Sequence, residues 1–170
     1  MRELLVTFWG ILSWRSGPRD LPSSNRLLRW VALSYFVTSW AQAALVYGPA
    51  NAHWFALGDL VLTVAVTVVC LFPSRWPRVP QTLSALLGTG ALLSVPMIVL
   101  LWLRPEGATD GFAAVLTMVS LPLLIWSGLV MAKILSQAMD KPLLLGIWIA
   151  LVYFALSYLL LDQLPQRVGG

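Results

Sequence analysis

The residue with the clearest capacity for chemistry is Asp59, a carboxylic acid inside the apolar segment 54–72. An ionisable side chain inside a membrane span is costly and needs a physical explanation. Counting from the same end of each expected span, Gln42, Thr117 and Tyr158 lie at about the depth of Asp59. One interpretation is an outward-opening polar pocket in which Asp59 accepts a cation or a proton. The alternative places Asp59 near the lipid headgroups, hydrogen-bonded to Gln42 or to water.

Two prolines, Pro96 and Pro122, lie in similar phrases, "SVPMIVLLW" and "SLPLLIW". A proline inside a helix frees the carbonyl four residues earlier. Freed carbonyls can form a transporter binding site, or the bend is structural and serine hydroxyls and neighbouring helices satisfy it. Small residues that permit close helix approach are Ser84, Gly88, Gly90, Gly128 and Ala132. We therefore expect residues 83–103 and 112–133 to form a tightly packed, kinked hairpin.

Other catalytic constellations are missing from the sequence. His53 is the only histidine and Cys70 the only cysteine, which excludes a Cys-based metal cluster and an intrachain disulfide. No serine has a credible base partner, and "GTG" at 88–90 lacks the lysine of a phosphate-binding loop. We expect no metal, no cofactor and no enzymatic activity. An intramembrane enzyme would require a second acid beside Asp59.

Composition identifies the environment that must hold these residues. The chain has 170 residues, of which 59% are hydrophobic and 11% charged, and its mean hydropathy is +0.82. A soluble protein this apolar would expose large adhesive patches. The net charge of +4 comes from residues near span ends, without the basic, aromatic-interleaved stripe of a nucleic-acid surface. The sequence predicts an integral membrane protein whose first partner is the lipid bilayer, with no nucleic acid.

Crossing about 30 Å of hydrocarbon takes about 20 apolar residues as a helix. Five segments qualify: 28–47, 54–72, 83–103, 112–133 and 143–161. Their short connections predict one all-α bundle of five transmembrane helices. The expected organisation is an interfacial amphipathic helix at 1–16, a cytoplasmic elbow at 17–27, the transmembrane domain at 28–162 and a short external tail at 163–170.

The N-terminal segment is too short to cross a bilayer. As a helix it carries a narrow polar stripe made by Glu3, Thr7, Gly10 and Ser13, with apolar residues around the rest. This pattern is typical of a helix lying in the membrane interface, and docking onto a partner is the alternative. The elbow "SGPRDLPSSN" should end this helix at its Gly-Pro step.

The elbow should also begin the first span. Ser23, Ser24 or Asn25 can cap that helix, and Asp20 is expected to pair with a nearby arginine. The elbow and lipid-facing residues are Arg15, Arg19, Asp20, Arg26, Arg29, Arg75 and Arg78.

Basic residues divide unequally between the two expected sides. Nine lie on the N-terminal side: Arg2, Arg15, Arg19, Arg26, Arg29, Arg75, Arg78, Lys133 and Lys141. Two, Arg104 and Arg167, lie on the other. The positive-inside rule then predicts a cytoplasmic N-terminus and an external, periplasmic C-terminus.

Five spans with short loops, an amphipathic lead, and the phrases "QTLSALLGTGALLSVP" and "LPLLIWSGLVMAKIL" resemble the Yip family over about residues 25–162. The resemblance implies a five-helix membrane protein without known enzymatic chemistry. Eukaryotic Yip proteins are trafficking scaffolds that bind small GTPases through a longer soluble N-terminal region, which this sequence lacks.

These observations favour a non-enzymatic, multi-pass protein of a bacterial inner (plasma) membrane. We expect it to act as an accessory or scaffold subunit for membrane or envelope partners, through self-association or contacts with other membrane proteins. The alternative is a small oligomeric transporter or lipid-handling protein that uses the polar layer around Asp59.

Overall fold

The protein is all-helical throughout the residues that its computed structural model describes, 2–103 and 110–168, with no strand among them. The α-helices are α1 (Arg2–Leu12), α2 (Asn25–Tyr47), α3 (Pro49–Leu71), α4 (Val79–Trp102), α5 (Asp110–Met139) and α6 (Leu143–Val168). Two 3₁₀ turns, η1 (Pro18–Asp20) and η2 (Trp76–Arg78), lie in the connections. The expected all-α class is confirmed. Helix α6 continues through residues 163–168, which were expected to form a tail; residues 169–170 lie outside the described part.

Local chemistry explains where the first long helices begin and end. Ser24 is the N-cap of α2, and its hydroxyl accepts a hydrogen bond from the Leu27 backbone N–H at 3.4 Å. Gly48 alone joins α2 to α3, with φ of +83°, a conformation that a residue with a Cβ rarely adopts. Pro49 then starts α3 at a position where a missing N–H costs nothing. The two helices therefore form a very short antiparallel hairpin.

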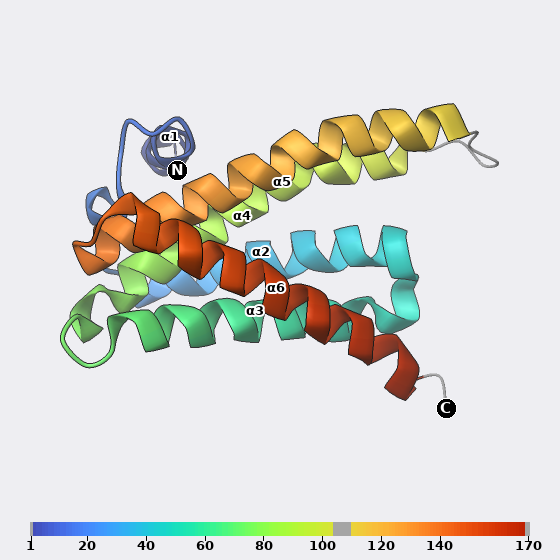
Figure 1. The fold of residues 1–170 in the computed structure, drawn as a ribbon. Coiled ribbons are helices and arrows are strands. Elements are labelled where there is room, and N and C mark those ends of the chain that lie inside the picture. Colours follow the sequence, from blue (N-terminus) through green and yellow to red (C-terminus); the bar gives the residue numbers. More distant parts are fainter. Residues whose placement is uncertain (1, 104–109, 169–170) are drawn as a thin grey trace.

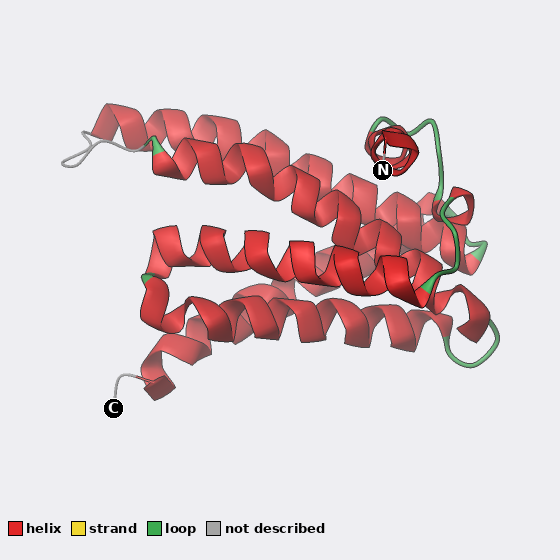
Figure 2. Cartoon of the chain, turned by 180° about the vertical axis from the view of Figure 1, so that it is seen from behind, coloured by secondary structure: helices red, strands yellow, loops and turns green. Residues whose placement is uncertain are grey.

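The five long helices run side by side and enclose a common interior (Figure 1). Helix α2 packs against α3 and α4, α4 also packs against α5, α5 against α6, and α6 against α3. The view from behind shows the long helices joined by short loops at both ends of the bundle (Figure 2). At the end of the bundle near η2, the interior is filled by Leu71, Leu87, Ile134 and Leu135, each at most 1% exposed. This end is the apolar core.

Helix α1 crosses the long helices and is viewed nearly end-on in Figure 1. Phe8, Ile11 and Leu12 are buried, and the Phe8 ring lies against the surface left open by Gly88 of α4. Its other face is also apolar, because Trp9 is 70% exposed. Helix α1 therefore packs on its own chain and still presents an apolar surface outward.

Three helices are long and apolar enough to cross a membrane: α3, the segment Trp76–Trp102 that includes α4, and Ala114–Met139 of α5. Helix α2 is as long as α3 but more polar. The apolar segment Leu143–Leu159 of α6 is shorter than these three helices. Large hydrophobic side chains are exposed along all these helices. The protein is therefore membrane-embedded.

The small residues expected to join the third and fourth spans face other helices instead. Gly90 lies opposite the Tyr35 ring of α2, and Gly128 lies opposite the Phe154 ring of α6. Helices α4 and α5 touch, but α4 packs more extensively on α2 and α5 on α6. The expected hairpin is thus not the tightest pair, because the glycines accommodate aromatic rings rather than each other.

Pro96 and Pro122 lie inside continuous helices α4 and α5. The neighbouring serines do not bind the carbonyls that these prolines free. Ser94 Oγ donates to Gly90 O at 2.9 Å, and Ser120 Oγ donates to Thr117 O at 3.2 Å. The expectation that serine hydroxyls satisfy the freed carbonyls is therefore wrong for these two serines.

The α5–α6 contact supplies a test of close helix packing. A Cβ at Gly146 would overlap the backbone carbonyl oxygen of Ala132, which cannot rotate away. We expect Gly146→Ala to lower the free energy of unfolding by about 1–3 kcal/mol, as overpacking does. Denaturant titration in detergent measures this change. The matched control is Gly128→Ala on the same interface, whose Cβ would lie 3.0 Å from a Phe154 ring carbon that can turn; equal losses would contradict the interpretation.

Candidate functional site

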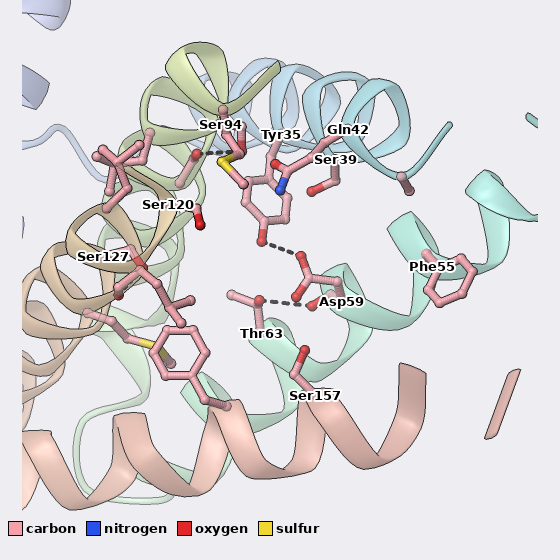
Figure 3. Close-up of a pocket in the computed structure, with 18 of the residues that line it drawn as sticks. Tyr35, Ser39, Gln42, Phe55, Asp59, Thr63, Ser94, Ser120, Ser127 and Ser157 are labelled. Carbon is pink, nitrogen blue, oxygen red and sulfur yellow. Dashed lines mark hydrogen bonds between the residues drawn. The ribbon is translucent and has the colours of Figure 1, made fainter. Parts of the chain in front are cut away.

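A cavity of about 700 Å³ lies inside the ring of helices, on the side of the core toward Gly48. All five long helices, α2 to α6, contribute to its wall. Its size falls within the range of small-molecule binding sites. Figure 3 shows hydroxyl, amide and carboxylate side chains from different helices pointing into it. The cavity is open to the outside of the bundle, because its lining residues Leu121, Leu124 and Tyr158 are exposed.

Asp59 of α3 is held in this cavity by two tyrosines. The Tyr35 hydroxyl of α2 donates to Asp59 Oδ2, and the Tyr153 hydroxyl of α6 donates to Asp59 Oδ1 at 2.5 Å. The Thr63 hydroxyl lies 3.0 Å from the Tyr153 hydroxyl and 2.9 Å from the backbone oxygen of Asp59. Tyr153 and Thr63 are buried. Hydrogen bonds to a charged acceptor are strong, so this network joins α2, α3 and α6.

The structure places all four residues of the predicted polar layer around this cavity. Asp59, Gln42 and Thr117 line it, and Tyr158 belongs to its wall while remaining 71% exposed. The partners of the Asp59 carboxylate are the tyrosines, rather than the Gln42 amide that the alternative interpretation proposed. The other polar groups of the wall are mostly hydroxyls, including those of Ser39, Ser94, Ser120, Ser127 and Ser157. The prolines at 96 and 122 are not part of the wall.

Asp59 is the only charged residue among the described side chains that line the cavity. Within the described residues, no group of three His, Cys, Asp or Glu side chains is placed to hold a metal ion. The wall combines one carboxylate, many hydroxyls and a larger apolar area. Such a surface can bind and orient a ligand that has both a polar and an apolar part.

Sequence reasoning missed the two tyrosines that hold Asp59. A signal for Tyr35 was present, because Tyr35, Ser39 and Gln42 are spaced by four and three residues and so share one face of α2. In the same way, Asp59 and Thr63 lie one turn apart on α3. Tyr153 lies five residues before Tyr158, and its role depends on how α6 is rotated.

A second polar cluster lies at the core end of the bundle, where Asp140 follows α5. Arg19, Arg75 and Arg78 all form ion pairs with its carboxylate, the last at 2.9 Å. Arg78 also donates to a backbone oxygen of α5 at 3.1 Å. These contacts tie the elbow, the α3–α4 connection and the α5–α6 connection together. The sequence offered a signal, because Asp140 is the only acid in the two connections that follow α3 and α5 on the basic side of the chain.

The expected ion pair of Asp20 with an arginine is wrong. The Asp20 carboxylate accepts the Gly17 backbone N–H at 2.8 Å and so caps η1 locally. Arg19 turns instead to Asp140. Arg15, Arg26 and Arg29 of the elbow set are exposed. Arg104 lies outside the described residues, as does the side chain of Arg167.

Comparison with known proteins assigns no family: no family model, no curated protein and no solved structure matches this chain. The resemblance to the Yip family therefore stays a prediction.

Removing the Asp140 carboxylate tests whether this second cluster stabilises the bundle. We expect Asp140→Ala to lower the free energy of unfolding by about 1–2 kcal/mol, because three partly exposed ion pairs lose their common partner. Trypsin should also cleave faster after Arg19, which the cluster holds. The control is Glu3→Gln, which removes the same charge from an exposed side chain. An equal effect of both variants would attribute the change to net charge alone.

Proposed function

We propose that this protein is a small, multi-pass membrane protein that binds a ligand inside its ring of helices, as a transporter or a lipid-handling protein. One observation carries the proposal: a cavity of about 700 Å³ whose wall comes from all five long helices and contains a single carboxylate. A cavity of this size, open to the outside of the bundle and partly polar, is accessible to a small molecule or a lipid headgroup. Among the described residues of the wall, the Asp59 carboxylate is held by tyrosines and no histidine or lysine stands beside a serine, so we propose binding rather than catalysis.

We also propose that all five long helices, α2 to α6, cross the membrane. At 1.5 Å per residue, α2 with 23 residues and α6 with 26 residues are about 34 and 39 Å long, which is enough to cross the hydrocarbon. Both pack directly on α3 and line the same cavity as the three most apolar helices. The orientation of α1 across the bundle supports an interfacial position, with Trp9 on the lipid side.

We further propose that the core end of the bundle faces the cytoplasm. The Asp140 cluster and the exposed arginines of the elbow gather at the core end of the bundle. The positive-inside rule assigns that end to the cytoplasm, here of a bacterial inner membrane. The cavity then faces the external half of the membrane.

Cysteine labelling tests this topology. In a Cys70→Ser background, Asn51→Cys marks the start of α3 and Ser74→Cys marks the turn before α4. We expect a membrane-impermeant maleimide to label Asn51→Cys on intact cells and Ser74→Cys only after permeabilisation, because the two ends of α3 lie on opposite sides. Labelling of both sites on intact cells, or the reverse order, would contradict the proposed orientation.

Filling the cavity tests the proposed binding function. Ser39 and Ser34 both lie on α2, but Ser39 lines the cavity and Ser34 is exposed. We expect native mass spectrometry of the gently solubilised wild-type protein to show a bound small molecule. Ser39→Phe should lose that adduct because the ring occupies its space, whereas the control Ser34→Phe should keep it. An adduct that persists in Ser39→Phe would place the ligand elsewhere.

A scaffold role is the second candidate, and one observation favours it. Helix α5 also exposes apolar side chains that do not line the cavity, including Val115, Met118 and Ile125. In a membrane this surface meets either lipid tails or the helix of another protein. Crosslinking in the membrane followed by purification would support the scaffold role if one partner, or a second copy, is captured through α5. A protein that stays monomeric and captures nothing would count against it.

A further inference from the structure

The charge balance of the cavity restricts what it can bind. Asp59 is half-buried among the membrane helices, and no Lys, Arg or His is found among the described residues of the wall. A carboxylate in a low-dielectric site is costly without a counter-charge. The two tyrosine hydroxyls reduce this cost but remain neutral. A ligand with one positive charge would complete the neutralisation, whereas an anionic ligand would be repelled.

The geometry around Asp59 leaves room for such a charge. An ionised carboxylate has about four acceptor positions on its two oxygens. Tyr35 uses one position on Oδ2 and Tyr153 uses one on Oδ1. Figure 3 shows the carboxylate facing the open part of the cavity, with the hydroxyls of Ser39 and Ser157 on either side. The remaining acceptor positions can therefore receive N–H groups from a ligand.

The rest of the wall indicates the body of the ligand. Val46, Leu93, Met97 and Leu124 give the wall an apolar surface, and the stacked rings of Tyr47 and Phe55 add an aromatic part. Apolar groups of a ligand would be removed from water or headgroups against this surface. An aromatic face also attracts cations. The wall thus suits a molecule with one charged end and one apolar end.

We infer that the cavity binds a protonated amine with an apolar body, whose ammonium group pairs with Asp59 and donates hydrogen bonds to the surrounding hydroxyls. The amine can belong to a free molecule or to the headgroup of a lipid, because both present the same ammonium chemistry. This inference rests on the proposed binding function and specifies its ligand class.

The test compares three isosteric probes on the full chain in a neutral, amine-free maltoside detergent. The probes are 2-phenylethylamine, 2-phenylethanol and phenylacetate, which share a phenyl ring on a two-carbon chain and carry an ammonium, a hydroxyl or a carboxylate at its end. Calorimetric titration should show that the amine binds at least tenfold more tightly than the alcohol and that phenylacetate does not bind. Equal affinities for the amine and the alcohol would overturn the cation inference while leaving a binding cavity.

Two variants assign the effect to the carboxylate. Asp59→Asn should weaken amine binding at least tenfold and change alcohol binding less than twofold, whereas Glu3→Gln removes a remote acid and should change neither. Tyr35→Phe takes one donor from the carboxylate, so amine affinity should rise about threefold; a merely structural lesion would lower it. If Asp59→Asn does not fold, the response of Tyr35→Phe decides the question, and an unchanged or lowered affinity overturns the inference.

Displacement by lipids distinguishes a free amine from a lipid headgroup. It also separates failure of this inference from failure of the proposed binding function. Phosphatidylethanolamine, but not phosphatidylglycerol, should displace bound 2-phenylethylamine if the natural ligand is a lipid. Displacement by neither lipid supports a free amine. Displacement by phosphatidylglycerol as strongly as by phosphatidylethanolamine would overturn the cation inference. If no probe binds but Ser39→Phe removes a native adduct, the amine is rejected and the binding cavity is retained. If no probe binds and the wild-type protein carries no adduct, the proposed function is rejected as well.

Discussion

The hydrogen bonds accepted by the Asp59 carboxylate hold together the helices around the cavity, which we call the open half of the bundle. Its two oxygens accept hydrogen bonds from Tyr35 on α2 and from Tyr153 on α6, the latter 94 residues away in sequence. Helices α2 and α6 are not neighbours in the ring, since α3 lies between them. A side chain of α3 therefore fixes the spacing of both flanking helices at the depth of the cavity. Apolar packing beside the cavity joins α2 to α3, where Ala43, Ala52 and Phe55 are buried, so the hydrogen bond from Tyr153 adds the connection to α6.

The two halves of the molecule are held by different physical means. At the core end, large apolar side chains fill the interior, and Asp140 gathers Arg19, Arg75 and Arg78 from separate connections. At the other end, the interior is open and its polar groups are mostly hydroxyls. Packing makes the core end rigid, whereas directed hydrogen bonds keep the open end in shape. A binding cavity and a stable bundle can thus occupy the same five helices.

Sequence reasoning predicted the helical class, the membrane environment and a layer of polar residues, because each follows from composition or from counting along a helix. Counting gives the depth of a residue but not the direction in which its helix turns. Gln42 and Asp59 both line the cavity, while the hydrogen-bond partners of Asp59, Tyr35 and Tyr153, were missed. The ion pair of Asp20 failed for a related reason. Sequence proximity favoured its neighbours, whereas the fold brings Asp140 to Arg19 across 121 residues.

The distribution of charge connects the two halves. Three arginines share one carboxylate at the core end, whereas one carboxylate stands without a basic partner among the described residues of the cavity. The core end of the bundle is therefore positively charged, whereas the cavity carries a negative charge. With the basic end in the cytoplasm, a cation in the cavity approaches from the external side and moves in the direction that an inside-negative potential favours, by about 2.3 kcal/mol per charge for each 100 mV crossed. The charge asymmetry from which we propose the orientation would thus also favour occupation of Asp59 by a cation.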